Sequence, residues 1–189
     1  MALEHAILVS LSERSGSGYE LARRFAKSIG FFWAASHQQI YRALKRMEGL
    51  GWVSCEQVPQ DGRPDKKVYR VSPDGRAELE RWLAEPGEPG AIRDALAVKL
   101  RGASLGDTDA VIAEIARHRD RHAQLLQAYL AIRQRDFPEP DRLAGQQLHQ
   151  YLVLRGGIRA EEGFIAWCEE ALDAMRRDRA RNADGDDQQ

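Results

Sequence analysis

Apolar residues recur at helical spacing in the N-terminal quarter of the chain. Residues 3–11, 19–29 and 37–48 each place hydrophobic side chains three and four positions apart, which predicts three amphipathic helices. Small residues at 15–18 separate the first two helices, and Gly30 is suited to end the second. Ser36 is a suitable N-cap for the third helix. We expect its inward face to consist of Ile40, Ala43, Leu44 and Met47.

The spacing then changes from helical to alternating. Residues 52–57 alternate between two faces, which predicts a short strand, and residues 68–71 predict a second. Prolines and an Asp-Gly pair fill residues 59–66, so the two strands should form a β-hairpin around a loop. Ser72 and Pro73 suit the N-cap and first position of a fourth helix. Its inward face should carry Ala77, Leu79, Trp82 and Leu83.

A repeated Glu-Pro-Gly triplet at residues 85–90 marks the clearest boundary in the chain. Only helical patterns follow it, over residues 92–102, 108–135 and 141–179. The sequence therefore predicts four parts. They are a helix-and-hairpin domain at 1–84, a linker at 85–91, a helical domain at 92–180 and a flexible tail at 181–189.

The two long C-terminal helices carry a seam, a row of residues at alternating steps of three and four. The first seam runs through Val111, Ile115, His118, His122, Leu125, Tyr129 and Ile132, and the second through Tyr151, Leu154, Ile158, Glu161, Ile165, Cys168, Leu172 and Met175. One turn joins the helices, which predicts an antiparallel, coiled-coil-like hairpin. The seam either packs within one chain or joins two copies. For a homodimer, the contacts would come from Tyr151, Leu154, Ile158, Ile165 and Leu172.

Composition and charge narrow the function classes. The 189 residues are 43% hydrophobic and 30% charged with a net charge of −1, as in an ordinary globular protein. Residues 1–76 carry twelve Lys and Arg against eight Asp and Glu, so the N-terminal part is basic and the remainder acidic. The chain has no apolar run of membrane-spanning length and no signal-peptide pattern, so we expect a cytoplasmic protein with no membrane partner. Cys55 and Cys168 form no CxxC pair, and we expect structural thiols.

The order of three helices and a hairpin is that of a winged helix-turn-helix, and the third helix carries the candidate chemistry. Its outer faces present Ser36, His37, Gln38, Gln39, Tyr41, Arg42, Lys45 and Arg46. Such a helix fits the major groove, where Gln pairs with adenine and Arg with guanine. We therefore assign base contacts to Gln38, Gln39 and Arg42. Tyr41, Lys45 and Arg46 are the candidates for phosphate contacts.

The hairpin would form the wing. Its loop region carries Arg63, Lys66 and Lys67, and basic residues on a wing can lie on the DNA backbone or enter the minor groove. A solvated helix face and a surface loop are the alternatives for these residues. The conjunction of both features in the right order favours binding to double-stranded DNA.

Three segments resemble the PadR family of transcriptional regulators. Residues 40–53 are similar to the family's recognition-helix segment, residues 68–75 to its second wing strand and following turn, and residues 18–21 to its Gly-Tyr-Glu-Leu motif. The C-terminal half is similar in pattern and length to the long-armed subgroup, which includes virulence activators of the AphA type. The chain departs from the family at Arg42, where many members have proline, and at the Gln38-Gln39 pair.

The resemblance implies a homodimer that joins through its C-terminal helices and reads a palindromic operator with two winged domains. Most members repress, and the long-armed type activates. Some members bind flat aromatic compounds. We therefore expect a repressor with a small aromatic effector. The alternatives are an activator without a small-molecule ligand and a winged-helix module that binds protein.

Four aromatic residues are candidates for stacking on such an effector, with a role in the core as the alternative: Trp82, Tyr151, Phe164 and Trp167. Glu114, His118 and His122 have the spacing of a metal site on one helical face, but two of them also fall in the seam. We favour seam histidines and expect no metal and no cofactor. No catalytic motif is present, so we predict no enzymatic activity.

Overall fold

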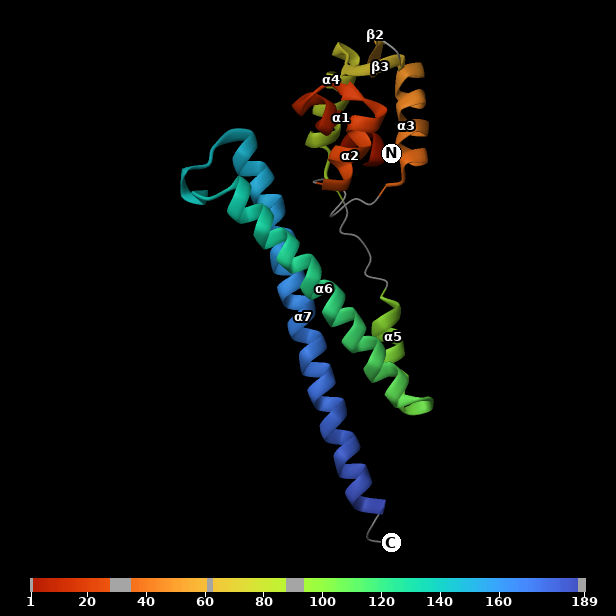
Figure 1. The fold of residues 1–189 in the computed structure, drawn as a ribbon, viewed down its shortest axis with the longest axis vertical. Coiled ribbons are helices and arrows are strands. Elements are labelled where there is room, and N and C mark those ends of the chain that lie inside the picture. Colours follow the sequence, from red (N-terminus) through yellow and green to blue (C-terminus); the bar gives the residue numbers. More distant parts are fainter. Residues whose placement is uncertain (1, 28–34, 61–62, 88–93, 187–189) are drawn as a thin grey trace. The chain divides into compact units, whose positions relative to one another are not determined.

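The computed structural model describes residues 2–27, 35–60, 63–87 and 94–186, and the chain divides into two compact units at residues 1–89 and 90–189. The first unit contains helices α1 (Ala2–Glu13), α2 (Gly18–Lys27), α3 (His37–Gly49) and α4 (Pro73–Ala84) and strands β1 (Gly16–Ser17), β2 (Val53–Gln60) and β3 (Arg63–Val71) (Figure 1). The strands form an antiparallel sheet in the order β1-β3-β2. This is the predicted winged helix-turn-helix.

The core of the first unit is built from the predicted apolar faces. Ile40, Ala43, Leu44 and Met47 of α3 are all buried, as the helical spacing indicates. They pack with residues of α1, α2 and the sheet, namely Ile7, Leu8, Leu11, Leu21, Ala22, Phe25, Val53 and Tyr69. This packing fixes which face of α3 remains exposed.

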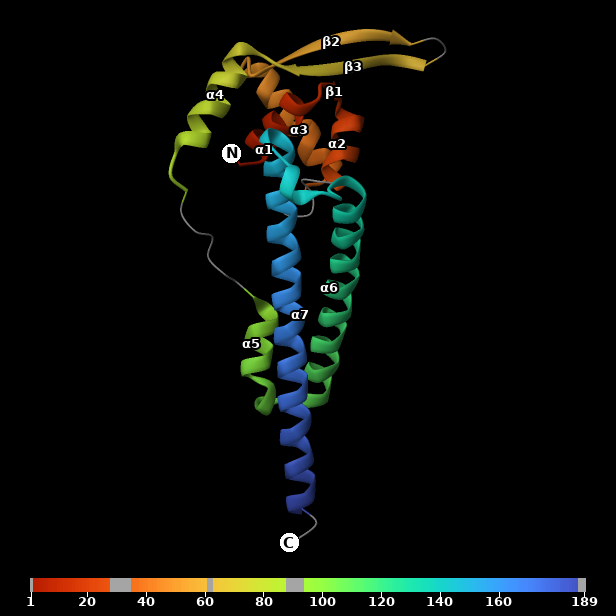
Figure 2. The ribbon, with the colours of Figure 1, turned by 90° about the vertical axis from the view of Figure 1, so that its left-hand side faces the viewer.

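The predicted hairpin loop at residues 59–66 is wrong, because the strands continue through most of it. Figure 2 shows β2 and β3 as a long two-stranded ribbon that extends beyond the helices of this unit. Val58 pairs with Lys66 and Gln60 with Arg63, and the register shifts between Val58 and Gln60. Pro59 lies at this shift, since proline has no N–H for the ladder and strands accommodate it at an irregularity. The connection at residues 61–62 lies outside the described residues.

The sequence pattern also missed β1. We predicted only a break at residues 15–18, yet Gly16 pairs with Tyr69 and Ser17 with Val68. A two-residue strand of small residues has no hydrophobic alternation by which it could be found. It matters because it attaches the start of α2 to the base of the ribbon, which we call the wing.

The second unit contains α5 (Ala95–Arg101), α6 (Thr108–Asp136) and α7 (Gly145–Asp186), with short 3-10 turns at Ala103–Leu105 and Pro140–Arg142. Helices α6 and α7 lie side by side and run antiparallel, as predicted (Figures 1 and 2). The core of this unit contains Leu96 of α5, Ile115 of α6, and Cys168 and Leu172 of α7. Helix α7 begins four residues later than predicted and extends to Asp186, into the segment that we expected to be a flexible tail.

Candidate nucleic-acid interface

The exposed face of α3 is centred on Gln38, Arg42 and Lys45. At 3.6 residues per turn these three positions lie opposite the buried face, and all three are exposed. Neither Arg42 nor Lys45 has an acidic group within ion-pair distance among the residues that the structure describes. The centre of this face therefore carries two cationic side chains and one amide, all available to a partner.

Two of the predicted DNA contacts begin the helix. The Ser36 hydroxyl accepts a hydrogen bond from the Gln39 N–H at 3.3 Å, and the Ser36 N–H donates to Gln39 Oε1 at 2.8 Å. This reciprocal pair is a capping box, which satisfies backbone donors that the first helical turn leaves open. The predicted N-cap is confirmed, and the side-chain oxygen of Gln39 accepts a hydrogen bond within the protein. Exposed His37 and Gln38 follow the cap directly.

The two flanks of this face contact neighbouring helices. The ring of Tyr41 lies so close to Gly18 at the start of α2 that a Cβ at position 18 would overlap it. On the other flank, the Arg46 guanidinium forms an ion pair with Glu4 of α1, a carboxylate with only 2% of its side chain exposed. Both Tyr41 and Arg46 remain substantially exposed beyond these contacts.

The wing has one paired and one exposed lysine on β3, at Lys66 and Lys67. The Lys66 ammonium lies 2.7 Å from Glu20 Oε1 of α2. The pKa of Glu20 is lowered to about 2, chiefly by the hydrogen bond from Lys66 and then by the Ser17 N–H. Lys67 is exposed, and because successive residues of a strand alternate, it points to the opposite face of the ribbon from Lys66. The side chain of Arg63 lies outside the described residues.

Trp82, an effector candidate, packs inside the first unit. Its indole stacks on the buried imidazole of His5 with ring centroids 4.5 Å apart and planes at 9°. His5 Nε2 also lies 2.9 Å from Glu78 Oε1. Arg81 and then His5 lower the pKa of Glu78 to about 2 by hydrogen bonding to its carboxylate. One face of the Trp82 ring is therefore covered by His5, and the side chain as a whole is half-buried.

The other aromatic candidates lie at two places in the second unit. Phe164 and Trp167 pack against each other and against the core around Leu172. Tyr151 lies roughly three and a half turns earlier on α7 and packs against Phe137, with centroids 5.7 Å apart. The three candidates of the second unit therefore do not form one pocket.

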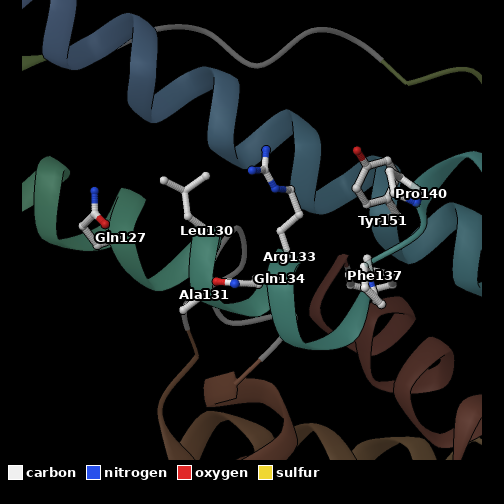
Figure 3. A pocket seen from close by; sticks show the side chains of 9 residues that line it. Gln127, Leu130, Ala131, Arg133, Gln134, Phe137, Pro140 and Tyr151 are labelled. Atoms are coloured by element: carbon white, nitrogen blue, oxygen red, sulfur yellow. The ribbon is translucent and has the colours of Figure 1, made fainter.

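Tyr151 lines a hollow of about 710 Å³ at the turn between α6 and α7 (Figure 3). The figure shows Leu130, Arg133 and Gln134 on α6, with Tyr151 and Pro140 across from them. The full lining is Gln127, Leu130, Ala131, Arg133, Gln134, Phe137, Pro138, Pro140 and Tyr151. It combines two aromatic rings with a guanidinium and two amides. Of these residues only Tyr151 was predicted from sequence, because the others come together only through the turn.

The five residues assigned to a dimer differ in what they leave exposed. Ile158 and Leu172 are 0% and 1% exposed within one protomer, so the alternative of intramolecular packing accounts for them. Tyr151, Leu154 and Ile165 are only partly buried. The large apolar side chains that α7 exposes are Leu152 and Val153, outside the predicted seam.

The residues of the candidate metal site bind other side chains. Lys99 donates to both carboxylate oxygens of Glu114, at 2.7 and 2.8 Å. His122 Nδ1 contacts Glu161 Oε2 of α7, and its ring packs against Phe164. His118 lies beside His122 with ring centroids 6.4 Å apart. Across the described ranges, no group of three metal-ligating side chains converges. Over the same ranges, no helix is both long and apolar enough to cross a membrane.

Known proteins resemble both units. The model of the PadR-like family of transcriptional regulators matches residues 7–81, and that of the virulence activator alpha C-terminal family matches residues 92–176. The probable transcriptional regulator Rv1176c of Mycobacterium tuberculosis is 53% identical over 189 residues, which cover 95% of this chain and 100% of that protein.

Solved structures share the fold of the whole chain. The Vibrio cholerae virulence activator AphA has a TM-score of 0.78 at 31% identity, covering 93% of this chain and 98% of its own. The negative transcriptional regulator PadR of Bacillus subtilis, solved with operator DNA and also with p-coumaric acid, has a TM-score of 0.81 in the DNA complex. That match is at 24% identity and covers 93% of this chain and 99% of the other. With the identity to the mycobacterial relative, these matches show that the chain belongs to the PadR-like family of transcriptional regulators.

Proposed function

We propose that this regulator binds a palindromic operator as a homodimer and represses transcription. The observation that carries the proposal is the exposed face of α3, which presents Gln38, Arg42 and Lys45. Neither cation of this face forms an ion pair within the described part of the chain. In this arrangement α3 lies in the major groove, Gln38 and Arg42 read base edges, and Lys45 binds phosphate.

The remaining candidates take supporting roles in the proposal. Tyr41 and Arg46 flank the face, are held by Gly18 and Glu4, and reach phosphates from those positions. Ser36 and Gln39 fix the start of the helix, which aims His37 and Gln38 at the groove. Arg63 and Lys67 are the wing's candidates for the backbone or the minor groove.

Selection of bound DNA from a random pool tests the proposal. We expect a palindromic motif whose binding weakens steeply with salt, because each phosphate contact releases counterions. Arg42→Ala should weaken the selected site by about 1–3 kcal/mol and relax preference at one base pair in each half-site. Arg159→Ala on α7, which also removes an exposed arginine, is the control. The absence of any enriched sequence would favour the protein-binding alternative.

We infer repression by analogy with B. subtilis PadR, whose name describes a negative regulator. AphA, by contrast, is named an activator. A reporter gene placed behind the selected operator distinguishes the two. If the regulator represses, reporter expression should fall when it is present and should recover when Arg42 is replaced. Increased expression would assign the chain to the activators.

We further propose that a small aromatic effector releases the operator, and that it binds in the hollow beside Tyr151 and Phe137. The rings of these residues can stack on a planar ligand, and Arg133 can pair with an acidic group on it. Calorimetric titration with phenolic acids should give heat in the wild type and none in Arg133→Ala. Binding that survives both Arg133→Ala and Tyr151→Ala would place the effector elsewhere.

A further inference from the structure

Glu20, in the Gly-Tyr-Glu-Leu segment, has no place among the proposed DNA contacts, yet its carboxylate joins three elements. Glu20 Oε2 accepts hydrogen bonds from the Ser17 N–H at 2.9 Å and the Ser17 hydroxyl at 3.1 Å. The Glu20 N–H donates to the Ser17 hydroxyl at 3.2 Å. Ser17 and Glu20 thus form a capping box at the start of α2, as Ser36 and Gln39 do for α3.

The second carboxylate oxygen leaves α2 and reaches the wing. Glu20 Oε1 accepts from the Lys66 ammonium at 2.7 Å, and Lys66 is two residues from Val68, the β3 partner of Ser17. The same side chain therefore holds β1, through Ser17, and β3, through Lys66. Ser17 pairs with Val68 near the middle of β3, and Lys66 lies farther out on the ribbon, three residues from Arg63, so the side chain of Glu20 holds the ribbon along part of its length.

The Glu20 carboxylate keeps its negative charge over a wide pH range. The hydrogen bonds from Lys66 and Ser17 keep the pKa of Glu20 near 2, so the carboxylate stays ionised at any physiological pH. A carboxylate at a helix N-terminus is also favoured by the helix dipole. Lys66 is less exposed than its partner, at 31% against 48%, and its ammonium is already neutralised. Lys67, the next residue, is exposed and has no acidic partner among the described residues.

On the basis of the proposed DNA-binding function, we propose that Glu20 is a positioning residue that anchors the wing through Lys66. Lys66 is thereby held away from phosphate, and Lys67 is the lysine of this pair that contacts DNA. Two adjacent lysines, for which the sequence predicts the same contact with DNA, thereby have different roles. It also gives a role to a glutamate that would otherwise be a surface residue near a DNA-binding face.

Hydrogen–deuterium exchange of the full chain without DNA tests the anchor. Glu20→Gln keeps an acceptor for the cap but loses the charge, Lys66→Met removes the ammonium, and Lys67→Met is the matched control. We expect exchange in residues 63–71 to accelerate by up to about fivefold in the first two variants, the range of an exposed ion pair, and to stay unchanged in the control. The double variant should equal either single one. Additive effects, or no acceleration, would overturn the anchor.

The salt dependence of binding to the selected operator tests the assignment of the two lysines. Lys67→Met should make the slope of log K against log salt shallower by about 0.9 for each wing, and Lys66→Met should leave the slope unchanged. A shallower slope in Lys66→Met would show that Lys66 contacts phosphate and would overturn the assignment. If the wild type binds no DNA, the proposed function fails, and the exchange experiment still decides the anchor.

Discussion

Gly75 shows how closely two backbones pack at the base of the wing. It lies in the first turn of α4, where its N–H donates to the Ser72 cap at 3.0 Å, and a Cβ on it would overlap the carbonyl oxygen of Trp52. The Trp52 carbonyl in turn accepts from the Ser72 N–H at 3.0 Å. Since the obstacle is backbone held by a hydrogen bond, it cannot rotate aside as a side chain could.

Gly75→Ala should therefore destabilise the first unit by about 1–3 kcal/mol, the cost typical of overpacking. Helix propensity alone would give the opposite sign, because alanine stabilises a helix by about 1 kcal/mol relative to glycine. Denaturant unfolding measures the difference. Gly49→Ala in α3, where nothing lies within 4 Å of the new Cβ, is the control and should be neutral or stabilising. Stability retained in Gly75→Ala would contradict the close approach.

Glu20 gives a second prediction at this scale, a pH dependence. Its pKa falls from 4.5 to about 2 on folding, so the unfolded chain binds the proton more readily. The corresponding stability is fully present above pH 4.5 and is lost as the pH falls toward 2. The pKa of Glu78 is also lowered to about 2, so the pH dependence of the wild type alone does not report on Glu20. The difference in unfolding free energy between wild type and Glu20→Gln should shrink over this range. A constant difference would contradict the lowered pKa.

At the scale of the element, the capping box of α3 links stability to recognition. Ser36→Ala leaves the Gln39 N–H without its partner and should cost about 1 kcal/mol. Ser36→Asp restores an acceptor and should recover most of that loss. Exchange of the first-turn amides of α3 reports the effect directly. His37→Ala, next in the chain and exposed, is the control; an equal loss there would argue against the cap.

Helix α3 could be predicted from sequence because it carries a complete apolar face, whereas α4 exposes two of its four predicted inward residues, Ala77 and Leu83. The four buried residues of α3 are those that its spacing indicates, and Ser36 and Ser72 cap as expected. The wing was predicted too short because Pro59 and the Asp-Gly pair are typical of loops, whereas backbone pairing continues past Pro59. Strand β1 has too few residues for any pattern.

The candidate site was predicted less well, because its polar side chains have partners far along the chain. Helical spacing identifies the exposed face of α3 but cannot show that Arg46 meets Glu4 or that Lys66 meets Glu20. The start of α2 was within reach, since Ser17 and Glu20 have the spacing of a capping box. The hollow beside Tyr151 depends on the geometry of the turn, which no periodicity encodes.

At the scale of the whole molecule, the residues that the structure describes form two separate hydrophobic cores, one in each unit. Leu44 is fully buried in the first core, and Leu172 is 1% exposed in the second. Each core is assembled from residues of its own unit, so we expect a substitution in one core to lower the stability of that unit alone. Stability is then a property of each unit rather than a single number for the chain.

Leu172→Ala tests this independence and also the seam. Removing a buried leucine should cost about 2–5 kcal/mol, depending on how far the cavity collapses. We expect faster exchange throughout residues 95–186 and unchanged exchange in residues 2–87. Because Leu172 is buried within one protomer, the loss should be the same at every protein concentration. Leu152→Ala removes a leucine that is 56% exposed, so any loss there should depend on concentration if α7 contributes to a dimer. Accelerated exchange in both units of Leu172→Ala would instead show that the two cores unfold together.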